Sequence, residues 1–221
     1  MAIMEPDYVS SVSKKIRRIT VTTYIGDVHG LYTPYKRIIR QYPNTIALGD
    51  MGLGFRRFNG SWRQNPPHKE MVRANARFIR GNHDNPESCR RHSQWLADGT
   101  IEDGKMFIGG AFSIDKEFRL EGHSWWEDEE LSQADMRVIA ETYLRCKPHT
   151  MVTHDAPITA IAQIHNTHHL YDNSRTQQFL QSLWNEHKPK LWIFGHHHRS
   201  FDQVIEGTRF VCLAELEVKD L

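Results

Sequence analysis

Short apolar or β-branched runs recur along the chain, and most of them end at a glycine followed by a polar residue. Runs of this length, bounded by turn residues, are typical of strands in a buried sheet. We expect strands at 19–25, 45–48, 77–80, 148–153 and 191–194. Two further pairs of runs, at 100–108 and 201–213, predict hairpins that turn at Asp103-Gly104 and Glu206-Gly207.

Apolar residues at helical spacing lie between these runs. Helices are expected at 34–41, 69–76, 132–146 and 174–186. Ser132 is placed to cap the third of them. The remaining long segments have no clear period and are expected to be loops, at 51–67, 111–130 and 155–173. Predicted strands and helices alternate in the N-terminal part of the chain, and short strands predominate near the C-terminus. This order indicates an α/β protein with one mixed sheet or two packed sheets.

Five short segments end in residues that can bind a metal ion. The segments are Gly26-Asp27-Val28-His29-Gly30, Gly49-Asp50-Met51-Gly52, Gly81-Asn82-His83-Asp84, Thr153-His154-Asp155 and Gly195-His196-His197-His198. One such segment alone is more often a simple turn, because Asn and Asp also favour turns. Five in order at strand ends are hard to assign to coincidence. Sites in open α/β sheets lie outside the carboxyl ends of strands, so we expect these side chains to gather there.

The residue types favour a pair of transition-metal ions. Carboxylate and amide oxygens mixed with imidazole nitrogens suit Mn, Fe, Zn or Co better than Ca or Mg. The absence of cysteine from the set argues against a closed structural zinc site. Asp50 has two carboxylate oxygens and can bridge two ions. Two ions about 3.5–4 Å apart activate a bridging water as the hydroxide nucleophile, and His83 is the candidate general acid for the leaving group.

Together these motifs resemble the calcineurin-like metallophosphoesterases. The pattern of that family is Asp-x-His, Gly-Asp, Gly-Asn-His-Asp/Glu, a strand-end His and Gly-His-x-His, and all five are present in order from Asp27 to His198. The resemblance implies an α/β fold with four layers, a sandwich of two mixed sheets flanked by helices. We expect one domain over 1–221, with 1–15 as a loose arm.

The resemblance also implies which residues hold two divalent ions, with manganese expected first and Fe, Zn, Co or Ni as alternatives. One ion would take Asp27, His29, Asp50 and His198, and the other Asp50, Asn82, His154 and His196. His83 matches the catalytic histidine of the family. His197 stands at a variable position and is not expected to be a ligand.

The chain departs from the serine/threonine phosphatase branch of this family. That branch follows Gly-Asp with Val-Asp-Arg-Gly, whose Asp orients the catalytic histidine and whose Arg binds phosphate. Here Asp50 is followed by Met51-Gly52-Leu53-Gly54, so both are missing. Asp84 is the local candidate to orient His83. The segment 109–116, with Trp125-Trp126 after it, instead resembles small bacterial and phage members.

We expect a hydrolase of phosphomonoesters or phosphodiesters, with a preference for nucleotide or nucleic-acid-end substrates. Arg56, Arg57 and Arg63 follow the bridging aspartate and are candidates to bind phosphate, with solvated loop charges as the alternative. Trp125 and Trp126 are candidates to stack on a base, although packing of their loop onto the core is the favoured interpretation.

Two rival functions are a nuclease of the same family and a noncatalytic scaffold with this fold. The formal net charge of +1, from 28 basic and 27 acidic residues, argues against the nuclease, because a duplex footprint usually needs a basic face. A scaffold usually loses ligands, and this chain keeps them. Three separated cysteines, no apolar leader in Met1–Arg18 and no long apolar stretch predict a cytoplasmic protein without a membrane partner.

Overall fold

The structure is a computed structural model, and it describes residues 21–55, 65–166 and 174–221. The strands within these residues are β1 (Thr23–Ile25), β2 (Thr45–Ala47), β3 (Arg77–Phe78), β4 (Ile101–Glu102), β5 (Lys105–Ile108), β6 (Thr150–Thr153), β7 (Leu191–Phe194), β8 (Phe201–Ile205), β9 (Thr208–Cys212) and β10 (Val218–Asp220). The helices are α1 (Tyr32–Gln41), α2 (His68–Ala74), α3 (Pro86–Arg90), α4 (Gln133–Cys146), α5 (Ile158–His165) and α6 (Arg175–Glu186), with short 3-10 helices η1 (Lys116–Phe118) and η2 (Glu127–Glu129).

The strands form two mixed sheets. The four-stranded sheet has the order β10-β1-β2-β3, in which β1, β2 and β3 are parallel and β10 is antiparallel to β1. The six-stranded sheet has the order β4-β5-β6-β7-β9-β8. Its inner strands β5, β6, β7 and β9 are parallel, while the edge strands β4 and β8 are antiparallel to their neighbours.

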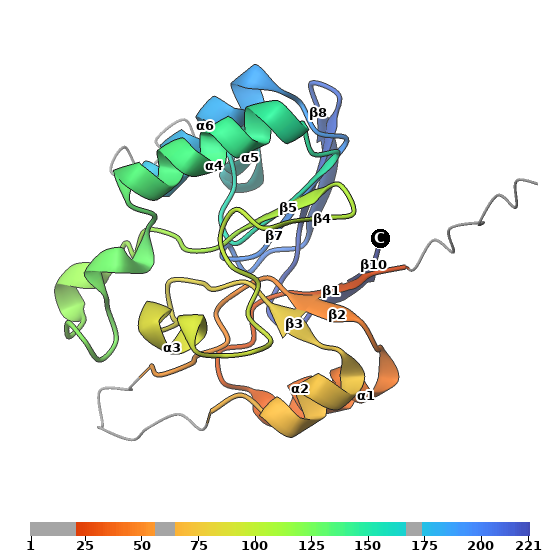
Figure 1. The fold of residues 1–221 in the computed structure, drawn as a ribbon, viewed down its shortest axis with the longest axis vertical. Coiled ribbons are helices and arrows are strands. Elements are labelled where there is room, and N and C mark those ends of the chain that lie inside the picture. The colour runs from red at the N-terminus through yellow and green to blue at the C-terminus, as the bar shows by residue number, and fades with distance from the viewer. Residues whose placement is uncertain (1–20, 56–64, 167–173) are drawn as a thin grey trace, which may run out of the picture.

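The sheets pack face to face between two helical layers, with α1 and α2 on one side and α4, α5 and α6 on the other (Figure 1). Three apolar clusters fill the three interfaces between these layers. In β7, Trp192 packs in the cluster under α4–α6 and Ile193 in the cluster between the sheets. In β1, Ile25 packs towards α1 and Tyr24 towards the other sheet. Alternate side chains of a strand point to opposite faces, so strands buried on both faces confirm the expected four-layer fold.

The structure also corrects the predicted elements at three places. Helix α5 lies in the segment 155–173, which was expected to be a loop; its apolar residues Ile161 and Ile164 pack into the core. The five-residue helix α3 and the strand β10 were not predicted either. Both expected hairpins are present, and the Ser132 side chain accepts the Asp135 N–H as an N-cap.

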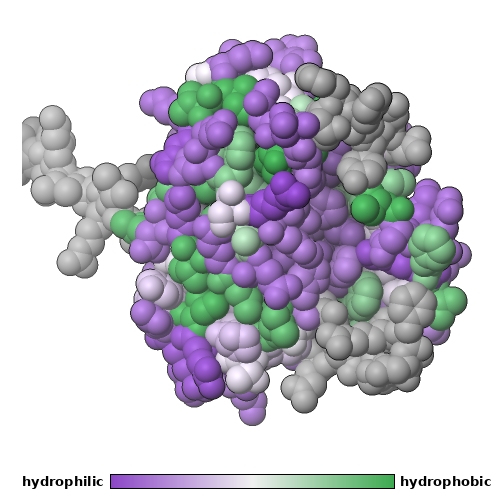
Figure 2. Space-filling model, turned by 180° about the vertical axis from the view of Figure 1, so that it is seen from behind, coloured by the Kyte–Doolittle hydropathy of each residue, from purple (hydrophilic) through white to green (hydrophobic). Residues whose placement is uncertain are grey.

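One face of the molecule is mostly polar. On the face seen in Figure 2, hydrophilic residues predominate and the apolar residues lie in small separate groups. None of the helices in the described part of the chain is long and apolar enough to cross a membrane. Residues 111–130 form a lobe at the left of Figure 1, beside the ends of the sheets.

Candidate metal centre

All seven predicted ligands lie on turns that follow strands of the two sheets. Asp27 and His29 follow β1, Asp50 follows β2 and Asn82 follows β3. His154 follows β6, and His196 and His198 follow β7. The two sheets meet at this point, because the His196 N–H donates to Asp27 Oδ1 at 3.1 Å and His154 Nδ1 lies 3.8 Å from the same oxygen.

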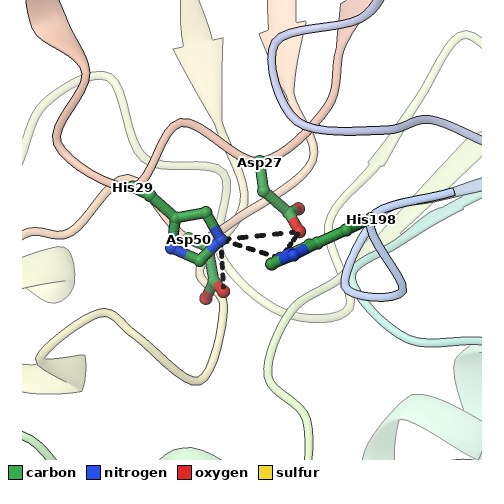
Figure 3. A group of neighbouring side chains, drawn as sticks. All are labelled: Asp27, His29, Asp50 and His198. Carbon is green, nitrogen blue, oxygen red and sulfur yellow. Dashed lines mark hydrogen bonds and ion pairs between the residues drawn. The ribbon is translucent and has the colours of Figure 1, made fainter.

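The first group of converging side chains is Asp27, His29, Asp50 and His198 (Figure 3). Their ligand atoms all lie within 4.8 Å of one another. Asp27 Oδ2 is 3.1 Å from His198 Nε2, and His29 Nε2 is 2.9 Å from His198 Nε2. Asp27 Oδ2 is buried and receives no well-oriented hydrogen bond from the described residues. An anionic oxygen and two imidazole nitrogens that converge in this way are suited to a cation.

The second group lies on the other side of Asp50. His154 Nε2 is 3.1 Å from Asn82 Oδ1 and 3.3 Å from Asp50 Oδ1. The ring of His196 lies beside that of His154, with 5.0 Å between the centroids. Asp50 therefore turns Oδ1 to this group, whereas its Oδ2 lies 3.6 Å from His29 Nε2 in the first group.

The protonation of His154 tests whether a cation fits the second group. Its Nδ1 lies 2.6 Å from the carbonyl oxygen of Leu48, which can only accept, so Nδ1 carries the proton. In the neutral ring, Nε2 then presents a lone pair to two oxygen acceptors, which is repulsive. Burial opposes a charge on His154, but the carboxylates of Asp50 and Asp27 raise its pKa to about 10. The site therefore favours a positive charge, and a divalent ion would supply it.

The local backbone is specialised to place these side chains. His29, Asp50, His196 and His198 all have φ between 47° and 63°, a left-handed conformation that costs non-glycine residues energy and is concentrated at functional sites. Glycines next to them leave no space for a side chain. A Cβ on Gly81 would lie 2.1 Å from Asp50 Oδ1, and one on Gly195 would lie 2.3 Å from Asp27 Oδ1. The glycines of these turns thus let the Asp50 and Asp27 side chains pack against the backbone of another turn.

The sequence matches the profile of the calcineurin-like phosphoesterases over residues 21–200. The chain belongs to that family. This confirms the resemblance noted in the sequence and the enzyme class that it implied, a metal-dependent phosphoesterase. A search of curated proteins gave no match.

Two solved structures are similar to this phosphoesterase. One, assigned as a 5′-nucleotidase from Staphylococcus aureus, aligns with a TM-score of 0.52 and 14% identity over 90% of this chain and 49% of that chain. This chain thus spans about half the length of that protein, and at such low identity only the fold is shared. A phosphopantetheinyl hydrolase from Mycobacterium tuberculosis aligns with a TM-score of 0.46 and 13% identity over 88% of this chain and 89% of that chain.

Side chains outside the ligand set fix the orientation of Asn82 in the phosphoesterase. The Asn82 amide nitrogen donates to Ser113 Oγ at 3.0 Å, which leaves its oxygen turned towards His154. Ser113 Oγ in turn donates to Glu129 Oε2 at 2.6 Å. Partners of this kind orient metal ligands. Both lie in the segment 111–130, whose irregular pattern gave no signal for this role.

The catalytic candidate His83 lies beside the second group. Its backbone N–H donates to Asp50 Oδ1 at 2.8 Å, and its ring stacks on Phe55 with 4.8 Å between centroids. Arg119 Nη2 lies 2.7 Å from His83 Nε2. A guanidinium can only donate, so Nε2 accepts and the imidazole is neutral. Burial lowers the pKa of His83 to about 4, and the Arg119 charge adds to this effect against the charge of Asp50.

Asp84, which was expected to orient His83, accepts hydrogen bonds from backbone groups instead. Its carboxylate accepts the backbone N–H groups of Met51, Leu53 and Gly81 at 3.1, 2.9 and 2.9 Å. A hydrogen bond to the His83 ring is not among its contacts within the described residues. Burial and the nearby Asp50 charge raise the pKa of Asp84 to about 7, although the three N–H donors act in the opposite direction. Asp84 thus holds together the turns that carry Asp50 and Asn82.

His197 belongs to a separate hydrogen-bonded chain. Its Nε2 is 3.0 Å from Asp155 Oδ1 and its Nδ1 is 3.0 Å from His165 Nε2. Burial favours the protonated form of Asp155, but the hydrogen bond from His197 and the charges of His196 and His197 lower its pKa to about 2. This chain anchors the Gly-His-x-His turn through its middle histidine.

A cavity of about 400 Å³ opens beside the metal centre. Asp50, Asn82, His83, His196 and His198 line one side of it. The rest of its wall includes Phe112, Ile114, Asp115, Arg119, Ser174 and Gln177. The predicted phosphate-binding residues Arg56, Arg57 and Arg63 lie outside the described residues. Trp126 is buried and its ring lies 6.3 Å from that of Phe55, which supports packing rather than base stacking.

Proposed function

We propose that this phosphoesterase hydrolyses a phosphate ester with two divalent ions, and that manganese is the ion to test first. One ion would be held by Asp27, His29, Asp50 and His198, and the other by Asp50, Asn82, His154 and His196. The observation that carries the proposal is Asp50, whose two oxygens face one group each. When bound, such a pair activates water and neutralises charge on a phosphoryl group.

His83 is proposed as the general acid that protonates the leaving oxygen. It lies on the cavity wall next to Asn82, within reach of a substrate at the metal centre. His83 is neutral in this structure, so its imidazole must first take up a proton to act as a general acid. The negative charge of a bound phosphate ester favours the imidazolium form, because an opposite charge within about 4–6 Å raises a histidine pKa.

A small phosphorylated molecule of nucleotide size is the proposed substrate class. A cavity of about 400 Å³ is within the size range of small-molecule sites. The formal net charge of +1 supports a small substrate over a long duplex, which would need a basic face.

Metal content and turnover of Asp50→Ala test the proposal. The wild-type protein is expected to bind two Mn²⁺ ions and to hydrolyse phosphate esters, and Asp50→Ala is expected to weaken both sites and lose activity. Asp202→Asn removes a surface carboxylate and serves as the matched control. If Asp50→Ala kept two tight ions, the shared-ligand assignment would be wrong.

The role of His83 has its own test. His83→Ala is expected to keep both ions and to lose turnover by roughly 10²–10⁴-fold, the range of general acid catalysis. The loss should shrink for nitrophenyl esters, because nitrophenolate leaves without a proton. An equal loss for alkyl and nitrophenyl esters would instead point to a role of His83 in binding phosphate.

A further inference from the structure

Arg119 is a buried cation at the metal centre that the sequence patterns did not reveal. Its side chain is only 7% exposed. Nη2 lies 2.7 Å from His83 Nε2 and 2.6 Å from Asp115 Oδ1, and Nη1 lies 3.4 Å from the carbonyl oxygen of Ser124. A guanidinium has five N–H donors, and these contacts use three of them. Donors therefore remain for a ligand in the cavity.

The position of Arg119 is unusual for a structural ion pair. Among the described residues that line the cavity it is the one arginine or lysine. Its partner Asp115 is 52% exposed, so water screens that carboxylate more strongly than it screens the buried guanidinium. The buried guanidinium thus lies at the place where His83 and the candidate metal ligands line the cavity.

We propose that Arg119 binds a phosphoryl oxygen of the substrate and makes this site selective for phosphomonoesters over phosphodiesters. The inference rests on the proposed function, since it assumes that phosphate esters react at this metal centre. A monoester has a second ionisation near pH 6 and is close to a dianion at neutral pH, whereas a diester carries one negative charge. A fixed, poorly solvated guanidinium stabilises the dianion more, and its remaining N–H groups can donate to a phosphoryl oxygen.

The neighbours of Arg119 are consistent with this class of substrate. Phe112 and Ile114 give the wall of the cavity an apolar part. A monoester places its single organic group against such a wall and its free oxygens towards Arg119. A diester would have to place a second organic group where those oxygens bind.

The experiment compares 4-nitrophenyl phosphate with bis(4-nitrophenyl) phosphate, which share a leaving group and differ in charge. The Mn-loaded chain of 221 residues is expected to have the higher kcat/KM for the monoester. Arg119→Gln should lower kcat/KM for the monoester by about 10- to 100-fold, the effect of a lost charged hydrogen bond. The diester value should stay within about threefold. Arg119→Lys keeps the charge and loses the planar guanidinium. Its kcat/KM for the monoester should lie between those of wild type and Arg119→Gln.

Lys116→Gln is the matched control, because it removes the same charge from an exposed residue of the same segment. It is expected to leave the monoester-to-diester ratio unchanged. If Arg119→Gln lowered kcat/KM equally for the monoester and the diester, the proposed role of Arg119 in selectivity would be wrong. If Arg119→Gln did not fold, inhibition by inorganic phosphate would be compared between Arg119→Lys and wild type. Inhibition at least tenfold weaker than in wild type would support the inference. Inhibition equal to that of wild type would overturn it. If wild type hydrolysed neither ester, the proposed function itself would fail.

Discussion

Replacing Gly195 by alanine should displace Asp27 and weaken the metal centre while the fold is retained. The new Cβ would lie 2.3 Å from Asp27 Oδ1 and 3.4 Å from Leu48 Cβ. Carbon and oxygen atoms essentially never approach closer than about 3.0 Å, so the carboxylate must move by roughly 0.7 Å. Gly195 does not have a positive φ that only glycine favours, so the effect is steric and local.

The size of the effect follows from the displacement of a ligand. Disturbing the support of a metal ligand typically costs 10- to 100-fold in affinity, so Mn²⁺ should bind roughly 10- to 100-fold more weakly at the site that uses Asp27. The metal-free protein should lose about 1–3 kcal/mol of stability, the usual cost of an inserted methyl in a packed site. Isothermal titration with Mn²⁺ and urea denaturation of the metal-free protein measure the two quantities separately.

Gly207→Ala provides the control for this prediction. No atom lies within 4 Å of a Cβ at Gly207, but its φ of +84° makes alanine strained there. This variant should lose about 1 kcal/mol of stability and bind Mn²⁺ like wild type. Unchanged metal affinity in Gly195→Ala, with Asp27 in its original position in a crystal structure, would refute the reasoning.

Three further predictions concern stability. Arg80→Ala should cost about 3–5 kcal/mol in urea denaturation, because it leaves Asp98 without its buried partner at 2.8 Å; a loss below 1 kcal/mol would contradict this. Phe107→Ala should cost about 3–5 kcal/mol by the same assay, since Phe107 fills the core between the sheets, and a small loss would mean that the sheets can close around it. Asp155 has a lowered pKa, so the stability it contributes is present above about pH 4 and lost as the pH falls towards 2; Asp155→Asn should flatten that part of the curve, and an unchanged slope would show that other groups produce it.

The convergence of the seven candidate ligands could be foreseen because each of them follows a strand. The apolar run ending at Ile25 and the glycine after it fix the position of Asp27, and His154 follows the last residue of β6, Thr153, directly. Carboxyl ends of parallel strands share one edge, so residues far apart in sequence converge there. The split of Asp50 oxygens between two groups needed the structure, since it depends on side-chain distances.

Other features of the site and of the fold have weak local signals or none. Arg119 lies 36 positions after His83 along the chain, within a segment of irregular pattern, and only the tertiary fold brings them together. Strand β10 is three residues long and is held by pairing with β1 across most of the chain. Helix α3 did have the signals of an Asn85 N-cap and Pro86 in its first turn, but it is too short to show a hydrophobic period.

The strained turns indicate how the fold and the metal centre depend on each other. Left-handed φ values at four candidate ligands cost of order 1–3 kcal/mol each, and they persist only where surrounding structure imposes them. Here that structure is the pair of sheets buried on both faces, together with the three backbone N–H groups held by Asp84. The surrounding structure thus holds the candidate ligand atoms within 4.8 Å of one another in the first group. A bound cation would offset the negative charges of Asp27 and Asp50. The free energy of metal binding would then offset the cost of the strained turns.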